Sequence, residues 1–99
     1  MSKPIRFKPE AERDFYNILQ WYIEINKFVT DKFTDEIDES LHIISENPQI
    51  GANYKFKIRK YVLIKFPYVI FYIEEDIEII ILAIFHGHSN PEVIRRVLE

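Results

Sequence analysis

The chain has 99 residues, a formal net charge of -3 and no cysteine. This length supports one domain, spanning residues 1–99, with one hydrophobic core. The lack of cysteine excludes disulfides, thiolate metal sites and cysteine nucleophiles. The acidic net charge disfavours charge-driven nucleic-acid binding, and we expect no sequence-specific DNA binding by this chain alone. No apolar run approaches the ~20 residues that span a bilayer, and the first residues do not resemble a signal peptide. We therefore expect a cytoplasmic protein with no membrane partner.

The first half of the chain predicts a strand followed by a helical hairpin. Residues 5–7 form a short strand pattern that ends before Pro9, and proline suits the first turn of a helix. Apolar residues then recur at three- and four-residue spacing over residues 11–25 and again over 29–44. The spacing loses phase around Asn26, and Asn47-Pro48 ends the second run. Two helices joined by a tight turn are expected.

The second half of the chain predicts three strands and a short helix. Alternating residues predict a strand over 55–65, bulged near Lys60, and further strands over 68–73 and 77–85. In the last strand we place residues 77, 79, 81, 83 and 85 on one face and 80, 82 and 84 on the other, as in a central strand covered twice. Asn90-Pro91 predicts a terminal helix over 91–98. The expected fold class is α+β, in the order β-α-α-β-β-β(-α), with a small antiparallel sheet packed against a helical hairpin.

Basic residues are concentrated in one predicted strand. Such a strand is typical of either a local basic surface or a solvated sheet face. The aromatic residues of 66–72 predict core packing in preference to a platform for stacked bases. The cations of the strand are Lys55, Lys57, Arg59, Lys60 and Lys65, and no acid lies among them.

His86 ends the most apolar predicted strand. Together with Lys57 and Arg59 it offers a proton-transfer group and positive charge, the requirements for phosphodiester cleavage. His86 and His88 project to the same side of an extended segment, but a metal site needs a third ligand, which we do not find nearby. The two glycines of the chain are too few for a glycine-rich phosphate loop. We expect neither a metal nor a cofactor.

Several short motifs, taken in order, resemble the RelE/ParE superfamily of type II toxin-antitoxin toxins. The resemblance covers nearly the whole chain, and the FPY strand and the long hairpin are more similar to the ParE arm. Arg59, Pro67, Tyr68 and His86 coincide with positions that the family uses. The motifs are the helical hairpin, Pro48 and Gly51, the strand with Arg59, FPYVIFYI at 66–73, IIILAIFH at 79–86 and Asn90-Pro91.

The resemblance implies a growth-inhibiting toxin that binds DNA gyrase and is neutralised by a cognate antitoxin wrapped around the sheet and the hairpin. It favours a binding mechanism over an enzymatic one. We assign target and antitoxin binding to Lys55, Lys57, Arg59, Lys60, Tyr68, His86, Arg95 and Arg96.

Two other functions stay open within the same resemblance. A RelE-like toxin would be an endoribonuclease that cuts mRNA on the ribosome, with Lys57 and Arg59 stabilising phosphate charge and His86 as acid or base. Such nucleases often carry a C-terminal tyrosine, but here no tyrosine follows Tyr72. A non-toxic family member would only bind an antitoxin, and Ser89, where the family often has arginine, is consistent with that loss.

Overall fold

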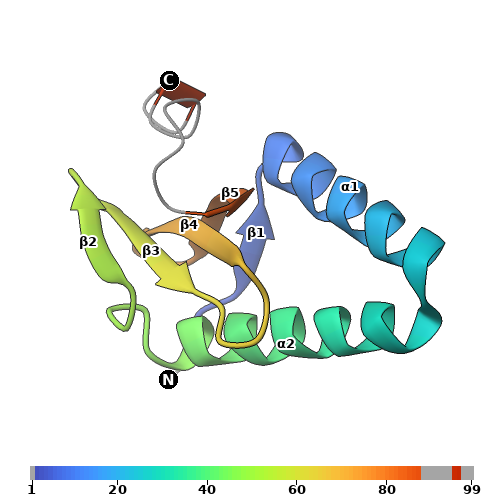
Figure 1. The fold of residues 1–99 in the computed structure, drawn as a ribbon. Coiled ribbons are helices and arrows are strands. Elements are labelled where there is room, and N and C mark those ends of the chain that lie inside the picture. The colour runs from blue at the N-terminus through green and yellow to red at the C-terminus, as the bar shows by residue number, and fades with distance from the viewer. Residues whose placement is uncertain (1, 88–94, 97–99) are drawn as a thin grey trace.

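The computed structural model of the chain describes residues 2–87, 95 and 96, and the α+β class is confirmed (Figure 1). Strand β1 (Ile5–Phe7) leads into helix α1 (Pro9–Ile25) and helix α2 (Lys27–Glu46). The strands β2 (Ala52–Lys55), β3 (Ile58–Val62), β4 (Tyr68–Glu74) and β5 (Ile79–His86) follow. Most of the terminal helix predicted over 91–98 lies outside the described residues, of which 95 and 96 are helical.

A single residue, Asn26, ends α1 and also caps α2. Its extended backbone, with φ -172° and ψ 130°, breaks the first helix. Its side-chain oxygen accepts hydrogen bonds from the backbone N–H groups of Phe28 at 2.7 Å and Val29 at 3.4 Å. Asparagine suits this position because its side chain satisfies donors that the first turn of a helix leaves open. The tight turn predicted at this residue is confirmed.

The five strands form one mixed sheet in the order β1-β5-β4-β3-β2. Strands β2 to β5 pair antiparallel, whereas β1 runs parallel to β5, with Ile5 opposite Ile79. The expectation of an antiparallel sheet therefore needs one correction. β5 is the most apolar strand and pairs on both edges, and β1 occupies the edge that β4 leaves open.

The strand predicted over 55–65 is instead two strands joined by a tight turn. β2 and β3 pair with Lys55 opposite Ile58, and the register shift lies between Asn53 and Lys55, away from the bulge predicted near Lys60. The turn residues 56 and 57 are phenylalanine and lysine. The sequence pattern did not predict this turn, because turns are usually marked by Gly, Asn or Pro and neither residue is of these types.

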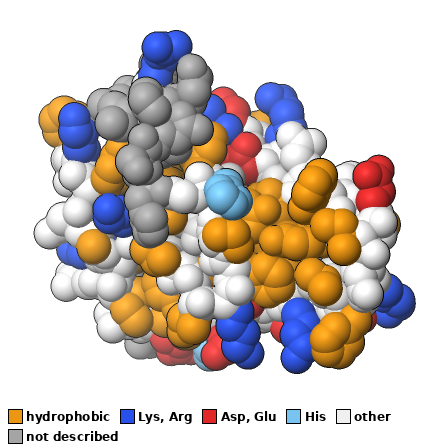
Figure 2. All heavy atoms as spheres, in the orientation of Figure 1, with side chains coloured by type: hydrophobic (Ala, Val, Ile, Leu, Met, Phe, Trp, Pro, Cys, Tyr) orange, Lys and Arg blue, Asp and Glu red, His pale blue; other side chains and the backbone are white. Residues whose placement is uncertain are grey.

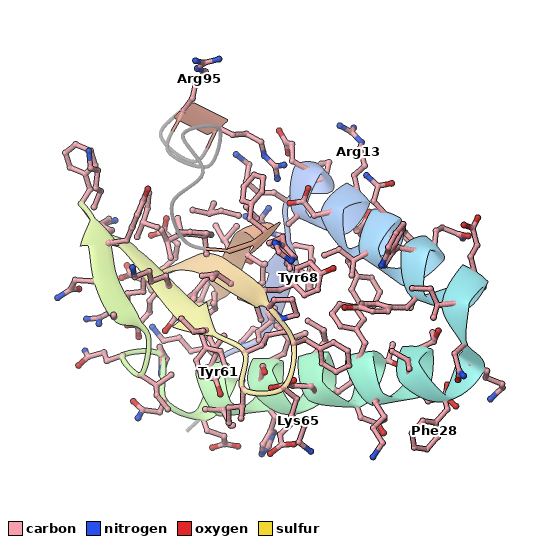
Figure 3. All side chains as sticks on the ribbon, viewed as in Figure 1. Arg13, Phe28, Tyr61, Lys65, Tyr68 and Arg95 are labelled. Atoms are coloured by element: carbon pink, nitrogen blue, oxygen red, sulfur yellow. The ribbon has the colours of Figure 1, made fainter. Side chains whose placement is uncertain are left out.

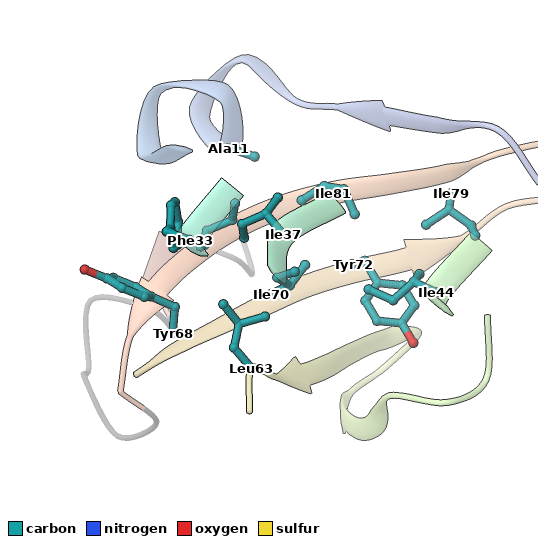
Figure 4. Close-up of a cluster of buried hydrophobic side chains, with 11 residues drawn as sticks. Ala11, Phe33, Ile37, Ile44, Leu63, Tyr68, Ile70, Tyr72, Ile79 and Ile81 are labelled. Atoms are coloured by element: carbon teal, nitrogen blue, oxygen red, sulfur yellow. The ribbon is translucent and has the colours of Figure 1, made fainter. Parts of the chain in front are cut away.

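The main hydrophobic core lies between the helical hairpin and one face of the sheet (Figure 4). Phe33, Ile37 and Ile44 of α2 are almost fully buried in it. Burying a side chain of this size stabilises the fold by roughly 1.5–3 kcal/mol. A smaller cluster occupies the opposite face and contains Ile58, Val69, Phe71 and Ala83.

A β-bulge in β5 decides which face its last residues occupy. Ile81 and Ala83 pair with successive residues of β4, so Leu82 between them has no partner there. Ile81 belongs to the helix-side core and Ala83 to the opposite cluster, so the sides change at the extra residue. The alternation predicted for residues 77–85 is therefore wrong beyond Ile81. Ile84 returns to the helix side, and His86 follows the same alternation.

Candidate functional site

An aromatic cluster joins the two helices to the end of the sheet. Phe33 of α2 lies at its centre, with its ring centroid 5.3 Å from that of Tyr22, 5.4 Å from Phe66 and 5.7 Å from Tyr68. Tyr22 belongs to α1, Phe66 to the loop before β4, and Tyr68 begins β4. His86 completes the cluster, with its ring 5.4 Å from Tyr68 and nearly perpendicular to it. The bulge in β5 is what brings His86 to this side.

Tyr68 organises the aromatic cluster and stays uncharged. It lies between α1 and the sheet (Figure 3), and only 7% of it is exposed. Burial raises the pKa of its hydroxyl, and a hydrogen bond with Tyr22 raises that pKa further. A tyrosine with so high a pKa is a poor general acid or base near neutral pH. The exposed member of the cluster is His86.

A shallow hollow of about 450 Å³ lies beside the aromatic cluster, lined by residues 62–68 and Gly87. Its rim is apolar, because Val62 is 45% exposed and Ile64 is 83% exposed. Figure 2 shows apolar side chains gathered on the viewed face of the molecule, next to a histidine. Exposed apolar side chains around a hollow of this kind are typical of a docking site.

Glu36 of α2 holds the loop that forms one wall of this hollow. Its carboxylate is mostly buried and accepts hydrogen bonds from the backbone N–H of Ile64 at 2.6 Å and of Lys65 at 3.0 Å. Sequence reasoning missed this residue, although a signal was present. Glu36 lies three residues after Phe33 and four before Ser40, so an acid occupies the buried face of α2. A buried carboxylate needs donors of this kind.

Arg59, a predicted binding residue, is engaged with the backbone. Its guanidinium donates to the carbonyl of Gly51 at 2.7 Å and to that of Gln49 at 3.3 Å. The same loop is held by Tyr72, whose hydroxyl donates to the carbonyl of Pro48 and accepts from the N–H of Gly51, both at 2.8 Å. A Cβ on Gly51 would lie only 2.6 Å from that hydroxyl oxygen. Arg59 therefore fixes the loop before β2.

The register of the sheet separates the three residues of the nuclease hypothesis. Arg59 pairs with Tyr72 on one side of β4, and His86 pairs with Tyr68 on the other. These two positions of β4 are four residues apart, about 13 Å at ~3.3 Å per residue. Lys57 precedes β3 and lies still farther from His86. Acid-base catalysis with charge stabilisation requires such groups to meet around one phosphate, and here they do not.

The remaining predicted cations of this region do not form one basic surface. Lys55 is exposed at the end of β2. Lys57 lies 3.6 Å from the carboxylate of Glu75, in the turn between β4 and β5. The ammonium of Lys60 lies 5.8 Å from the centre of the Tyr54 ring. The fold thus places an acidic turn beside the predicted basic strand.

Arg96 closes the edge of β5 beyond the end of β1. Its guanidinium binds both carboxylate oxygens of Asp14, at 2.9 and 2.7 Å, and lies 4.7 Å from the ring centre of Phe85. Asp14 also accepts the backbone N–H of Ile84 at 3.0 Å. The hydrogen bond and the charge of Asp14 raise the pKa of Arg96. Arg96 is thus a packing residue, whereas Arg95 is exposed.

The part of the chain that the structure describes contains neither a metal-binding cluster nor a membrane-spanning helix. Within residues 2–87, 95 and 96, no three His, Asp or Glu side chains are grouped closely enough to hold a metal ion. Neither α1 nor α2 has the length and hydropathy needed to cross a bilayer. His88, Ser89 and the Asn90-Pro91 step lie outside the described residues.

The arrangement of the helices and the sheet is shared with solved toxin structures. One is a chain of the chromosomal ParDE toxin-antitoxin system from P. aeruginosa, with a TM-score of 0.74 and 20% identity, covering 88% of this chain and 98% of that one. Another is a free mutant of E. coli toxin RelE, with a TM-score of 0.64 and 17% identity, covering 99% and 96%. The same RelE mutant bound to an antitoxin RelBc peptide gives a TM-score of 0.54 at 15% identity, covering 100% and 97%. At these identities the likeness establishes the fold.

The family is established by sequence. The model of the ParE toxin of the type II toxin-antitoxin system parDE matches residues 5–91. The chain therefore belongs to the ParE toxin family, within the RelE/ParE superfamily that its motifs predicted. A comparison with curated protein sequences finds no match.

Proposed function

We propose that this ParE-family toxin inhibits growth by binding DNA gyrase. The observation that carries the proposal is the separation of Lys57, Arg59 and His86 along the sheet. Arg59 is bound to the loop carbonyls, Tyr68 is buried, and His86 is isolated from both cations. This arrangement suits a protein that acts by surface contact better than one that cleaves a phosphodiester.

The proposed antitoxin site is the hollow beside the aromatic cluster. Ile64 and Val62 offer apolar contacts there, and Lys65 on the same hollow suits an antitoxin segment that is apolar and partly acidic. The RelE structure solved with an antitoxin peptide supports antitoxin binding by toxins of this fold. We also propose that the protein acts in the cytoplasm, together with these two partners.

The antitoxin site is tested with two exposed isoleucines. Ile64→Asp places a charge at the hollow, and it should weaken binding of the cognate antitoxin at least tenfold in calorimetry. Ile77→Asp is the matched control, because Ile77 is 78% exposed in the turn between β4 and β5. Equal losses in the two variants, or none in either, would remove the hollow as the antitoxin site.

The gyrase target is tested with the purified chain. We expect it to inhibit gyrase supercoiling of a relaxed plasmid or to promote gyrase-dependent DNA cleavage, and to leave mRNA on translating ribosomes intact. Absence of both gyrase effects would refute the target.

The same experiment separates the other two functions. Ribosome-dependent mRNA cleavage that is lost in Arg59→Ala and His86→Ala would establish the nuclease. A chain that binds its antitoxin but changes neither DNA synthesis nor translation would be a non-toxic binding module. In that case Ser89→Arg should restore toxicity.

A further inference from the structure

Phe56 occupies the first position of the two-residue turn between β2 and β3, with a φ of 53°. A positive φ at this position of a hairpin turn favours Gly or Asn, because a bulky side chain crowds the backbone there. The left-handed conformation costs roughly 1–2 kcal/mol for an ordinary residue. The ring recovers none of this cost by burial, because Phe56 is 89% exposed. Local folding requirements therefore do not explain this aromatic residue.

A second exposed apolar residue lies at the same end of the sheet. The β3–β4 register pairs Ile58 with Ile73, which places the Phe56 turn next to the turn that joins β4 to β5. The ion pair between Lys57 and Glu75, at 3.6 Å, links the two turns. Ile77 belongs to the second turn and is 78% exposed. We call this region, residues 55–57 and 75–78, the hairpin end.

The charges around the hairpin end favour a protein partner over a nucleic acid. Lys57 pairs with Glu75, and two further bridges join the neighbouring residues, Lys3 to Glu74 at 2.8 Å and Arg6 to Glu78 at 3.0 Å. Because each of these three cations is paired with an acid, the region has no cluster of positive charge to attract a phosphate backbone. Among the described residues, Lys55 forms no ion pair, so it offers one cation next to Phe56 in the chain.

We propose that Phe56 is the target-contact residue of this toxin. Its ring enters an apolar pocket of the target protein, and Lys55 meets a carboxylate at the rim of that pocket. Exposed aromatic side chains that become buried on binding often dominate an interface. The inference rests on the proposed function and assigns the target and the antitoxin to different surfaces.

Phe56→Asn tests the inference without threatening the fold, since asparagine tolerates a positive φ. The variant should unfold at an equal or higher temperature than the wild type. It should require at least tenfold more protein to inhibit gyrase, and it should bind the antitoxin within twofold of the wild type. Phe56→Trp should retain inhibition. Phe28→Asn is the matched control, because Phe28 is an exposed aromatic residue at the start of α2.

Growth assays at matched expression distinguish failure of this inference from failure of the gyrase proposal. If Phe56→Asn inhibits gyrase as well as the wild type does, Phe56 is not the contact residue and the gyrase target stands. If the wild type inhibits growth but not gyrase, and Phe56→Asn fails to inhibit growth, the contact residue stands and the target is another protein. A wild-type chain without any effect on growth or gyrase overturns both.

Discussion

The helix-covered face of the sheet and the hairpin end are built in opposite ways. Under the helices, Phe33, Tyr68 and Tyr72 are buried, and no buried side-chain nitrogen or oxygen of the described residues lacks a hydrogen-bond partner. At the hairpin end, Phe56 and Ile77 are exposed, and the backbone of Phe56 is in a costly conformation. Stability is therefore concentrated on the covered face, and substitutions at the hairpin end should affect binding rather than folding.

Gly51→Ala should give the largest loss of stability. The new Cβ would lie 2.6 Å from the Tyr72 hydroxyl oxygen and 2.9 Å from the backbone oxygen of Lys60, so the loop before β2 must shift and Tyr72 loses a hydrogen bond. We expect the free energy of unfolding to fall by about 3 kcal/mol in urea denaturation. Gly87→Ala is the control. A Cβ at Gly87 meets nothing within 4 Å. Only the positive φ should therefore lower the free energy of unfolding, by about 1 kcal/mol.

Equal losses at the two glycines would contradict the close packing that the covered face shows. They would mean that the loop before β2 moves aside for the new methyl group, because the effect of Gly→Ala on the unfolded chain favours folding and cannot cause a loss of stability.

Glu36→Ala should give the second largest loss, because it removes the acceptor for two backbone N–H groups, those of Ile64 and Lys65. We expect a fall of about 2 kcal/mol in the free energy of unfolding, and faster amide hydrogen exchange at both residues. Glu39→Ala, an exposed acid on the same helix, serves as the control. Unchanged exchange at Ile64 and Lys65 would show that Glu36 does not hold this loop.

The smallest effect should be the dependence of stability on alkaline pH. Burial raises the pKa values of Tyr68 and Tyr72 above the ordinary value of 10.0. The unfolded chain therefore releases protons above pH 10 that the folded chain keeps, so stability is complete below that pH and falls as the pH rises above it. Tyr68→Phe should make this fall shallower between pH 10 and 11.

Tyr22→Phe separates the two causes of the Tyr68 shift. It removes the hydrogen-bond partner and keeps the burial, which is the larger cause, so most of the pH dependence should remain. Urea denaturation at a series of pH values measures both variants. If Tyr68→Phe leaves the slope of the free energy of unfolding against pH unchanged, the folded protein does not raise the pKa of this hydroxyl.

Local signals in the sequence were reliable where a single residue type determines the backbone. Pro9 marks the start of α1 and Asn26 the turn between the two helices, and the apolar spacing on both sides of Asn26 identified the hairpin and its buried stripe. The turn at Phe56 and the bulge at Leu82 were not visible, because neither position carries a residue that favours a turn or a bulge. The bulge alone reverses the side of β5 on which His86 lies.

The sequence by itself determined the α+β class, the helical hairpin, the most apolar strand and the membership of the toxin superfamily. These properties follow from periodicity, helix-capping residues and short motifs, which act over a few residues. Only the tertiary structure decided that Arg59 and Arg96 bind groups of the chain itself, that Glu36 holds a loop, and that Lys57 lies beside an acid. The physical reason is that a charged side chain takes its role from the partners within hydrogen-bond reach, and those partners lie 8 to 82 residues away in the chain.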